Sequence, residues 1–179
     1  MLRGNGRGCG VARPVAIMEE LFDAKGNPPL DPSLLPIFQR YKQENEHWIP
    51  DFDLWSYLNL RADIDLAAAF SKLFWPDFVE IDGCVLLALH YERDNFEHWK
   101  EHFDGNRSAI EAMINHVHIH DLFVNSASRV EYPAELKQYL GKVLLICWRH
   151  ALEDAFPSRH FVFSIAGPSE PSISFYQAG

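Results

Sequence analysis

Three histidines alternate with β-branched residues between positions 116 and 121, a stretch that ends on a carboxylate. Imidazole is the commonest metal ligand that proteins offer near neutral pH. In an extended strand, His116, His118 and His120 share one face and can hold a metal ion with one position left for water. In a helix, only His116 and His120 lie on the same face. The apolar periodicity before this stretch, and the Leu122-Phe123 pair after it, favour the helix.

His90 follows a predicted strand and is the best further ligand for such a site. A divalent transition metal such as zinc, held by these imidazoles, would lower the pKa of a bound water, while Asp121 would orient one ligand. One hypothesis is therefore a small metal-dependent hydrolase that uses the cluster of His116, His118 and His120. The ordinary alternative is that the histidines cap, hydrogen-bond or line a helix without any metal.

A second histidine pair, His98 and His102, brackets Glu101 with the spacing used by helical zinc peptidase sites. On a helix both imidazoles share one face, and the glutamate can activate a zinc-bound water. The chain is small for that class of enzyme, so a solvated, charged helix is the favoured interpretation. If the chain turns sharply at 104–106, His102 and His116 lie roughly 12 Å apart along the helix axes, too far for one ion.

Aromatic residues are dense between positions 38 and 57, where four carboxylates lie among them. Packing in a hydrophobic core is the ordinary explanation of such a cluster. The functional alternative is a partner-binding surface, because tryptophan and tyrosine dominate the energetics of protein interfaces. Tyr41, Trp48 and Trp55 are the candidate anchors of that surface, and Glu44, Glu46, Asp51 and Asp53 would form an acidic rim around them.

The charge of the chain restricts the kinds of partner. The 179 residues carry a formal net charge of −9, and residues 1–17 hold three arginines and no acid, which leaves −12 for residues 18–179. Such a body repels the phosphates of nucleic acids and of anionic membranes. A basic protein partner fits better, because complementary fields steer association. The leading hypothesis is a protein-binding module, such as an adaptor or a neutraliser of a basic toxin or enzyme.

The cysteines and the apolar runs indicate a cytoplasmic protein. Three widely spaced cysteines, Cys9, Cys84 and Cys147, do not form a disulfide framework and are typical of a reducing compartment. The apolar run Val143–Trp148 is far shorter than the roughly 20 residues that cross a bilayer. Arg13-Pro14 interrupts the early apolar stretch, which argues against a signal peptide.

The first 75 residues are predicted to hold a tail and a helical layer. Residues 1–17 are rich in glycine and arginine and are predicted to be disordered, and Met18 is an alternative start to Met1. A turn at 26–29 precedes three helices: one runs from the Asp31 cap to about Asn45, and two lie near 51–60 and 63–74.

Residues 76–179 are predicted to hold the strands and the core helices. Asp82-Gly83 between strand-like runs indicates a tight hairpin, because a type I′ turn needs positive φ at both central residues. Short helices over 95–103 and from 107, a long helix from Pro133 to about 156, and a second hairpin over 161–175 follow. The sequence thus predicts one α+β domain over 18–179: two hairpins sharing an antiparallel sheet of about four strands, packed against the long helix.

Overall fold

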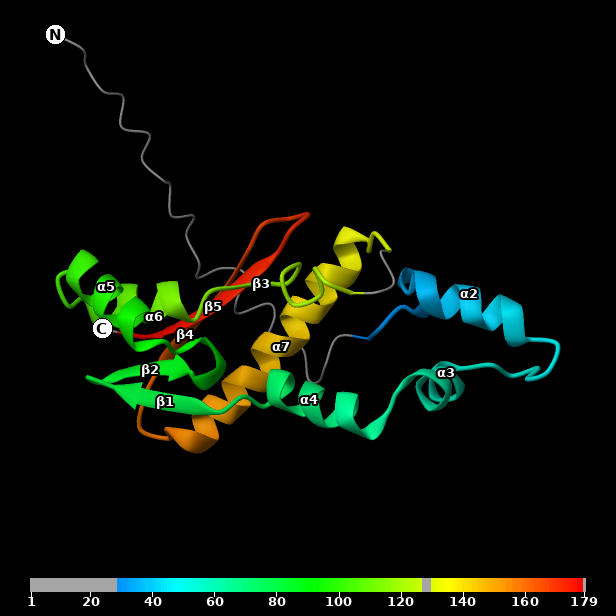
Figure 1. Cartoon of the computed structure of the whole chain (residues 1–179), viewed down its shortest axis with the longest axis horizontal. Coiled ribbons are helices and arrows are strands. Elements are labelled where there is room, and N and C mark those ends of the chain that lie inside the picture. Colours follow the sequence, from blue (N-terminus) through cyan, green and yellow to red (C-terminus); the bar gives the residue numbers. More distant parts are fainter. Residues whose placement is uncertain (1–28, 127–129, 179) are drawn as a thin grey trace, which may run out of the picture.

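The computed structural model describes residues 29–126 and 130–178, and these form an α+β fold (Figure 1). The predicted tail of residues 1–17 and the alternative start at Met18 lie outside the described residues. The described chain contains helices α2 (Pro36–Asn45), α3 (Leu54–Arg61), α4 (Ile64–Phe74), α5 (Arg93–His102), α6 (Arg107–Ile114) and α7 (Ala134–Ala155), strands β1 (Phe78–Ile81), β2 (Cys84–Leu87), β3 (Val117–His118), β4 (Phe161–Ala166) and β5 (Ser172–Gln177), and the 3-10 turns η1 (Pro32–Leu34) and η2 (Ala88–His90).

Three α-helices, α2 to α4, form the predicted N-terminal helical layer. The Asp53 side chain accepts the Ser56 amide hydrogen at 2.8 Å, and Asp63 caps α4 in the same way. The first helix begins later than predicted. Asp31 caps only the short turn η1. Helix α2 begins at Pro36, because the proline ring disfavours helical backbone angles at the preceding residue, Leu35.

The first predicted hairpin is confirmed. Strands β1 and β2 pair antiparallel, with Phe78 opposite Leu87. Asp82 and Gly83 both have positive φ, 51° and 80°, which is the conformation that this two-residue turn requires. Every residue of β2 is buried, so the hairpin packs closely against the rest of the fold.

The second predicted hairpin is also confirmed, but the two hairpins do not share one sheet. Strands β4 and β5 pair antiparallel, and β3 joins the other side of β5, so this sheet has the order β3-β5-β4. The β1–β2 hairpin is a separate two-stranded sheet. The prediction of a single four-stranded sheet was therefore wrong, although the α+β class and the antiparallel pairing were right.

Two side chains at the C-terminal end of α6, Glu111 and the C-cap residue Asn115, explain why the sheets stay separate. Glu111 and Asn115 are both fully buried, with 0% exposure. The Val85 amide donates to Glu111 Oε1 at 2.7 Å, and the Leu87 amide donates to Asn115 Oδ1 at 2.9 Å. The backbone amide of Gln177 in β5 donates to Glu111 Oε2 at 2.6 Å. The side-chain amide of Asn115 donates to the Val85 carbonyl of β2 and to the Phe175 carbonyl of β5. The side chains of Glu111 and Asn115 thus bond to backbone groups of β2 and β5 that could otherwise pair with a neighbouring strand.

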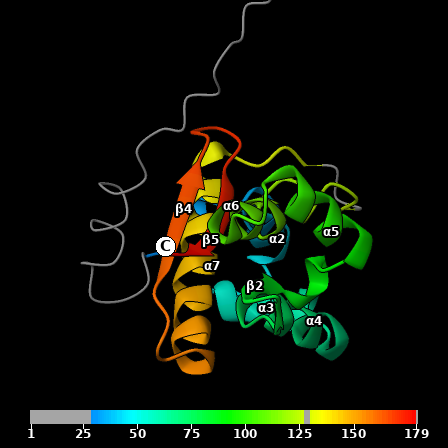
Figure 2. The ribbon, with the colours of Figure 1, turned by 90° about the vertical axis from the view of Figure 1, so that its left-hand side faces the viewer.

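The main core lies between α7 and the β3-β5-β4 sheet. Figure 2 shows α7 beside the β4–β5 hairpin, with α6 next to β5. Trp148 of α7 is 2% exposed, and its indole Nε1 donates to the Leu73 carbonyl at 2.8 Å, which ties α4 to α7. A smaller core joins the first hairpin to α5 and α6 through Cys84, Leu86, Phe96, Ile110 and Ile114.

The N-terminal helices α2 and α3 extend away from the two sheets (Figure 1). The main contacts of α2 are with α3 and η1, whereas α4 contacts α7. We call residues 29–76 the arm and the rest of the described chain the body. No helix in the described parts of the chain is long and apolar enough to cross a membrane.

Candidate functional site

The arm carries most of the exposed large hydrophobic side chains among the described residues. Eight of these eleven side chains lie between positions 48 and 75, and Trp48 and Trp55 are 85% and 77% exposed. Single exposed apolar residues are ordinary, but a concentration of large ones marks a surface that binds something. The eight are Trp48, Ile49, Trp55, Leu58, Leu60, Ile64, Leu66 and Trp75.

Other aromatic residues of the arm form a small core of their own. The Phe38 ring centre lies 6.0 Å from that of Phe52 and 5.6 Å from that of Tyr57. Phe38 and Phe52 are 4% and 3% exposed. Because α2 and α3 already pack through these rings, Trp48 and Trp55 are not needed to hold the two helices together.

Tyr41 occupies an intermediate position between these two groups. Its half-buried ring contacts Tyr57 at 5.8 Å between centres. The Arg61 guanidinium lies 5.0 Å from the Tyr41 ring centre, and Arg40 lies 5.9 Å away. Of the three predicted anchors, Tyr41 is therefore engaged within the arm, whereas Trp48 and Trp55 point to solvent.

The loop between α2 and α3 is acidic. Residues 44–55, which we call the arm tip, contain four carboxylates and neither lysine nor arginine. All four carboxylate residues are exposed. Hydrogen bonds from the Ser56 backbone and side chain lower the pKa of Asp53 and so favour its charged form. The arm tip thus combines two exposed tryptophans with four exposed carboxylates, of which Glu44 also pairs with Arg40 of α2 at 4.0 Å.

The histidine stretch is not helical, so the favoured helical interpretation was wrong: Val117–His118 forms a short strand, and residues 119–125 form turns. Helix α6 ends at Ile114, because the Asn115 side chain that follows turns inward to the strands. Val117 and Ile119 are 5% and 2% exposed, whereas the histidines between and beside them are exposed. This alternation is that of a strand, and it places His116 and His118 on the same face.

The four predicted metal ligands do not come together. The rings of His116 and His118 are neighbours, with centres 4.6 Å apart. His90 instead hydrogen-bonds to the backbone of Ile114, and His120 lines a separate cavity. Among the residues that the structure describes, no group of three or more histidine, cysteine or acidic side chains could hold a metal ion.

Two of these histidines have lowered pKa values. Burial lowers the pKa of His90, and the hydrogen bond to Ile114 only partly opposes this effect. The side chain of His116 is exposed, but partial desolvation by the surrounding protein, together with the neighbouring His118, lowers its pKa. Both imidazoles are therefore neutral at pH 7, the state in which a ring nitrogen can accept a proton or a metal.

The other histidine pair lies on α5. His98, Glu101 and His102 are all exposed, as expected for a solvated helix. The two imidazole rings are stacked, with centres 6.3 Å apart and planes inclined by 25°.

The described cysteines are poor nucleophiles. Cys84 is buried, and burial together with the charge of Glu111 raises the pKa of its thiol to about 11. Burial also raises the pKa of Cys147. Since the thiolate is the reactive form, neither residue is activated at neutral pH.

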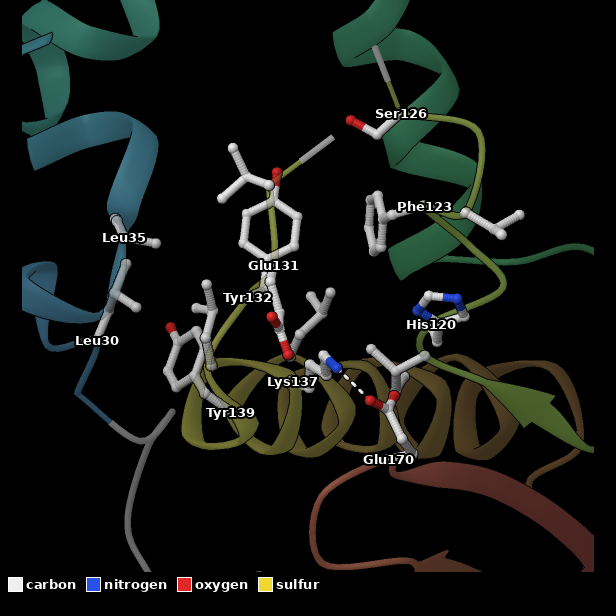
Figure 3. Close-up of a pocket in the computed structure, with 15 residues that line it drawn as sticks. Leu30, Leu35, His120, Phe123, Ser126, Glu131, Tyr132, Lys137, Tyr139 and Glu170 are labelled. Carbon is white, nitrogen blue, oxygen red and sulfur yellow. Dashed lines mark hydrogen bonds and ion pairs between the residues drawn. The ribbon is translucent and has the colours of Figure 1, made fainter. Parts of the chain in front are cut away.

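A cavity that the sequence analysis did not predict lies beside the N-terminal half of α7 (Figure 3). Its volume is about 610 Å³, and aliphatic and aromatic side chains form most of its wall. Three separate segments build it, so no local sequence spacing could have revealed it. Its described lining comprises Leu30, Leu35, Ile119, His120, Phe123, Val124, Ser126, Val130, Glu131, Tyr132, Leu136, Lys137, Tyr139, Leu140 and Glu170.

Lys137 and Glu170 form an ion pair in the wall of the cavity, beside α7 (Figure 3). The Lys137 side chain is 15% exposed, and that of Glu170 is 58% exposed. The hydrogen bond from Lys137 lowers the pKa of Glu170, and the charge of His120 contributes in the same direction. The cavity thus presents an apolar wall beside one paired cation and anion.

Comparison of the chain with protein-family models, with curated proteins and with solved structures finds no match in any of the three. The candidate sites therefore rest on the geometry and chemistry of these residues alone.

Proposed function

We propose that this protein works by binding a basic protein partner through the arm tip. The observation that carries the proposal is the exposure of Trp48 and Trp55, at 85% and 77%. Tryptophan is among the residues that contribute most to binding energy when an interface covers it. Two such side chains within eight positions give a partner a concentrated apolar contact.

The charge of the arm tip supports a basic partner. Glu44, Glu46, Asp51 and Asp53 lie within a few positions of the tryptophans in the sequence, and residues 44–55 contain no lysine or arginine. A partner's arginine or lysine can stack on a tryptophan face while it pairs with a neighbouring carboxylate. An adaptor, or a neutraliser that covers the functional surface of a basic toxin or enzyme, has these requirements.

The proposed location is the cytoplasm. Cys84 and Cys147 are free thiols in the described structure, and free cysteines are typical of reducing compartments. An acidic protein that acts there can select basic proteins by charge, and the tryptophans then supply specific contacts.

The test is a quantitative pull-down from a lysate with wild-type protein, with the Trp48→Ala/Trp55→Ala variant and with Trp75→Ala. Trp75 is also exposed, at 51%, but lies outside the arm tip, so it is the matched control. We expect a basic protein to be enriched by the wild type and by Trp75→Ala and lost with the double variant. Titration of that purified partner should show weaker binding at higher salt, because the contact is partly electrostatic.

Two results would contradict the proposal. One is a bound set of proteins that is unchanged in the double variant. The other is loss of stability in the double variant: since both side chains are exposed, its free energy of unfolding should stay within about 0.5 kcal/mol per substitution of the wild type. A loss of several kcal/mol would show that the tryptophans hold the fold.

The hydrolase alternative has less support. A catalytic zinc site usually has three protein ligands and one open position. In the described residues only His116 and His118 come together among the four predicted ligands.

A second candidate function is binding of a small amphipathic molecule in the cavity beside α7. Its volume of about 610 Å³ lies within the range of ligand pockets, and its lining is mostly apolar with a few polar groups. Octanoate and octylamine are suitable probes, since one can pair with Lys137 and the other with Glu131 or Glu170. Shifts of the Leu136 and Leu140 methyl resonances with one probe would support a pocket, and no shifts with either would reject it.

A further inference from the structure

We propose that His116 and His118 together chelate one divalent transition-metal ion, with the remaining coordination positions occupied by water. The proposal is independent of the arm tip and of partner binding. It replaces the three-imidazole site predicted from the sequence with a pair on either side of Val117, at the start of β3, whose rings the structure brings together.

The distance between the rings suits chelation. In a zinc site each imidazole nitrogen lies about 2.0–2.1 Å from the ion, which places the centres of two bound rings roughly 5 Å apart. The ring centres of His116 and His118 are 4.6 Å apart, and their planes are inclined by 70°. With this inclination, small rotations of exposed side chains bring one nitrogen of each ring to a common point.

The backbone beneath the two histidines is held in place. Val117 pairs with Ile173, and His118 pairs with Ser172. The Ile119 amide donates to the Pro171 carbonyl at 3.0 Å, and Val117 and Ile119 are buried in the core. Because the sheet holds His118 and also Val117, the residue next to His116, binding a metal mainly requires ordering the two side chains, which favours binding.

The ligand type indicates which ions the pair selects. Imidazole suits zinc, copper and nickel, whereas magnesium and calcium prefer oxygen ligands. No third histidine, cysteine or carboxylate in the described parts of the chain is close enough to complete the site. We therefore expect a reversible site whose ion keeps several bound waters.

The pair on α5 is the matched comparison. His98 and His102 are also two exposed histidines on one face of an element, but their rings are 6.3 Å apart and inclined by only 25°. The two pairs have the same ligand chemistry and differ in geometry. Replacing each pair separately thus distinguishes the proposed site from nonspecific binding to surface histidines.

The experiment is calorimetric titration of untagged full-length protein with zinc chloride, together with electron paramagnetic resonance of the copper(II) complex. We expect one zinc ion per chain, and copper hyperfine structure from two nitrogens. His116→Ala and His118→Ala should each weaken zinc binding by about 10²-fold, because a single imidazole loses the chelate effect. The His98→Ala/His102→Ala variant should retain the site.

Retention of the wild-type zinc affinity in both His116→Ala and His118→Ala would overturn the proposal. Loss of binding in the α5 variant, with binding intact in the β3 variants, would also overturn it and assign the ion to α5. The folding control is the amide NMR spectrum of each variant. His116→Gln and His118→Gln provide a second pair of variants that keep a polar side chain at each position.

Discussion

The body buries polar side chains, whereas the arm exposes large apolar ones. The body buries a carboxylate and an amide, Glu111 and Asn115, and satisfies both with backbone hydrogen bonds. The arm leaves Trp48 and Trp55 exposed, while Phe38 and Phe52 are buried within it. A buried polar group is tolerated when its hydrogen bonds are made, whereas an exposed tryptophan contributes little to folding. The comparison separates residues that build the fold from residues that are free to bind.

The largest expected contrast is between two tryptophans. Trp148→Ala should lower the free energy of unfolding by about 4 kcal/mol, because it leaves a cavity and removes the hydrogen bond to Leu73. Trp48→Ala should change it by less than about 0.5 kcal/mol. Urea-induced unfolding followed by circular dichroism measures both. Similar losses for the two variants would break the distinction between arm and body.

A smaller effect is expected for a change that preserves shape. Glu111→Gln should lower the free energy of unfolding by about 2 kcal/mol, because an amide hydrogen then faces a donor. The groups concerned are the amides of Val85 and Gln177 and the Gln177 side chain, all of which donate to Glu111. The control is Glu101→Gln, an exposed position on α5, which should unfold like the wild type. Equal stability of both variants would refute this role for the buried carboxylate.

The smallest expected effect is a pH dependence confined to the body. Burial lowers the pKa of His90 in the folded protein, and partial desolvation with the neighbouring His118 lowers that of His116, both below the value of 6.5 for an unperturbed histidine. The unfolded chain therefore binds more protons as the pH falls through this range. The stabilisation is present above pH 6.5 and is lost as the pH falls through the folded-state pKa values.

Unfolding at pH 7.5 and at pH 5.5 tests this dependence. The wild type should be less stable at the lower pH, and His90→Gln/His116→Gln should show a smaller difference. His47, the only histidine of residues 29–76, supplies the control, because it is exposed in the arm. The His47→Gln variant should lose as much stability between pH 7.5 and pH 5.5 as the wild type does. An unchanged difference in the double variant would assign the effect to other groups.

Local chemistry was enough to predict much of the fold. The Asp82-Gly83 turn and the long apolar helix α7 each depend on residues close together in the sequence. Their backbone conformations follow from φ preferences, hydrogen bonding and periodicity. These elements formed where the sequence predicted them, with differences at the ends such as the late start of α2.

The relations between distant segments were not predictable in the same way. Periodicity alone did not indicate that Asn115 would turn toward β2, yet that contact accompanies the end of α6 and the extended stretch after it. The separation of the two sheets also depends on contacts between distant segments, namely those of Glu111 and Asn115 with β2 and β5. The cavity beside α7 also requires three segments to meet.

The candidate sites were predictable to different degrees. Composition identified Trp48 and Trp55, but only the structure shows that Phe38 and Phe52 pack inside while these two do not. The histidine run was visible in the sequence, whereas the division of its members between β3 and the cavity was not.

The hydrogen bonds between β2 and α6 also affect self-association. A strand with free amides and carbonyls along one side can template the addition of a strand from another molecule, which is a common route to aggregation. In β2, the amides of Val85 and Leu87 and the Val85 carbonyl are already bonded to Glu111 and Asn115. A foreign strand would have to displace two buried side chains before it could pair there. The same contacts that divide the molecule into two sheets thus close this strand against sheet growth between copies.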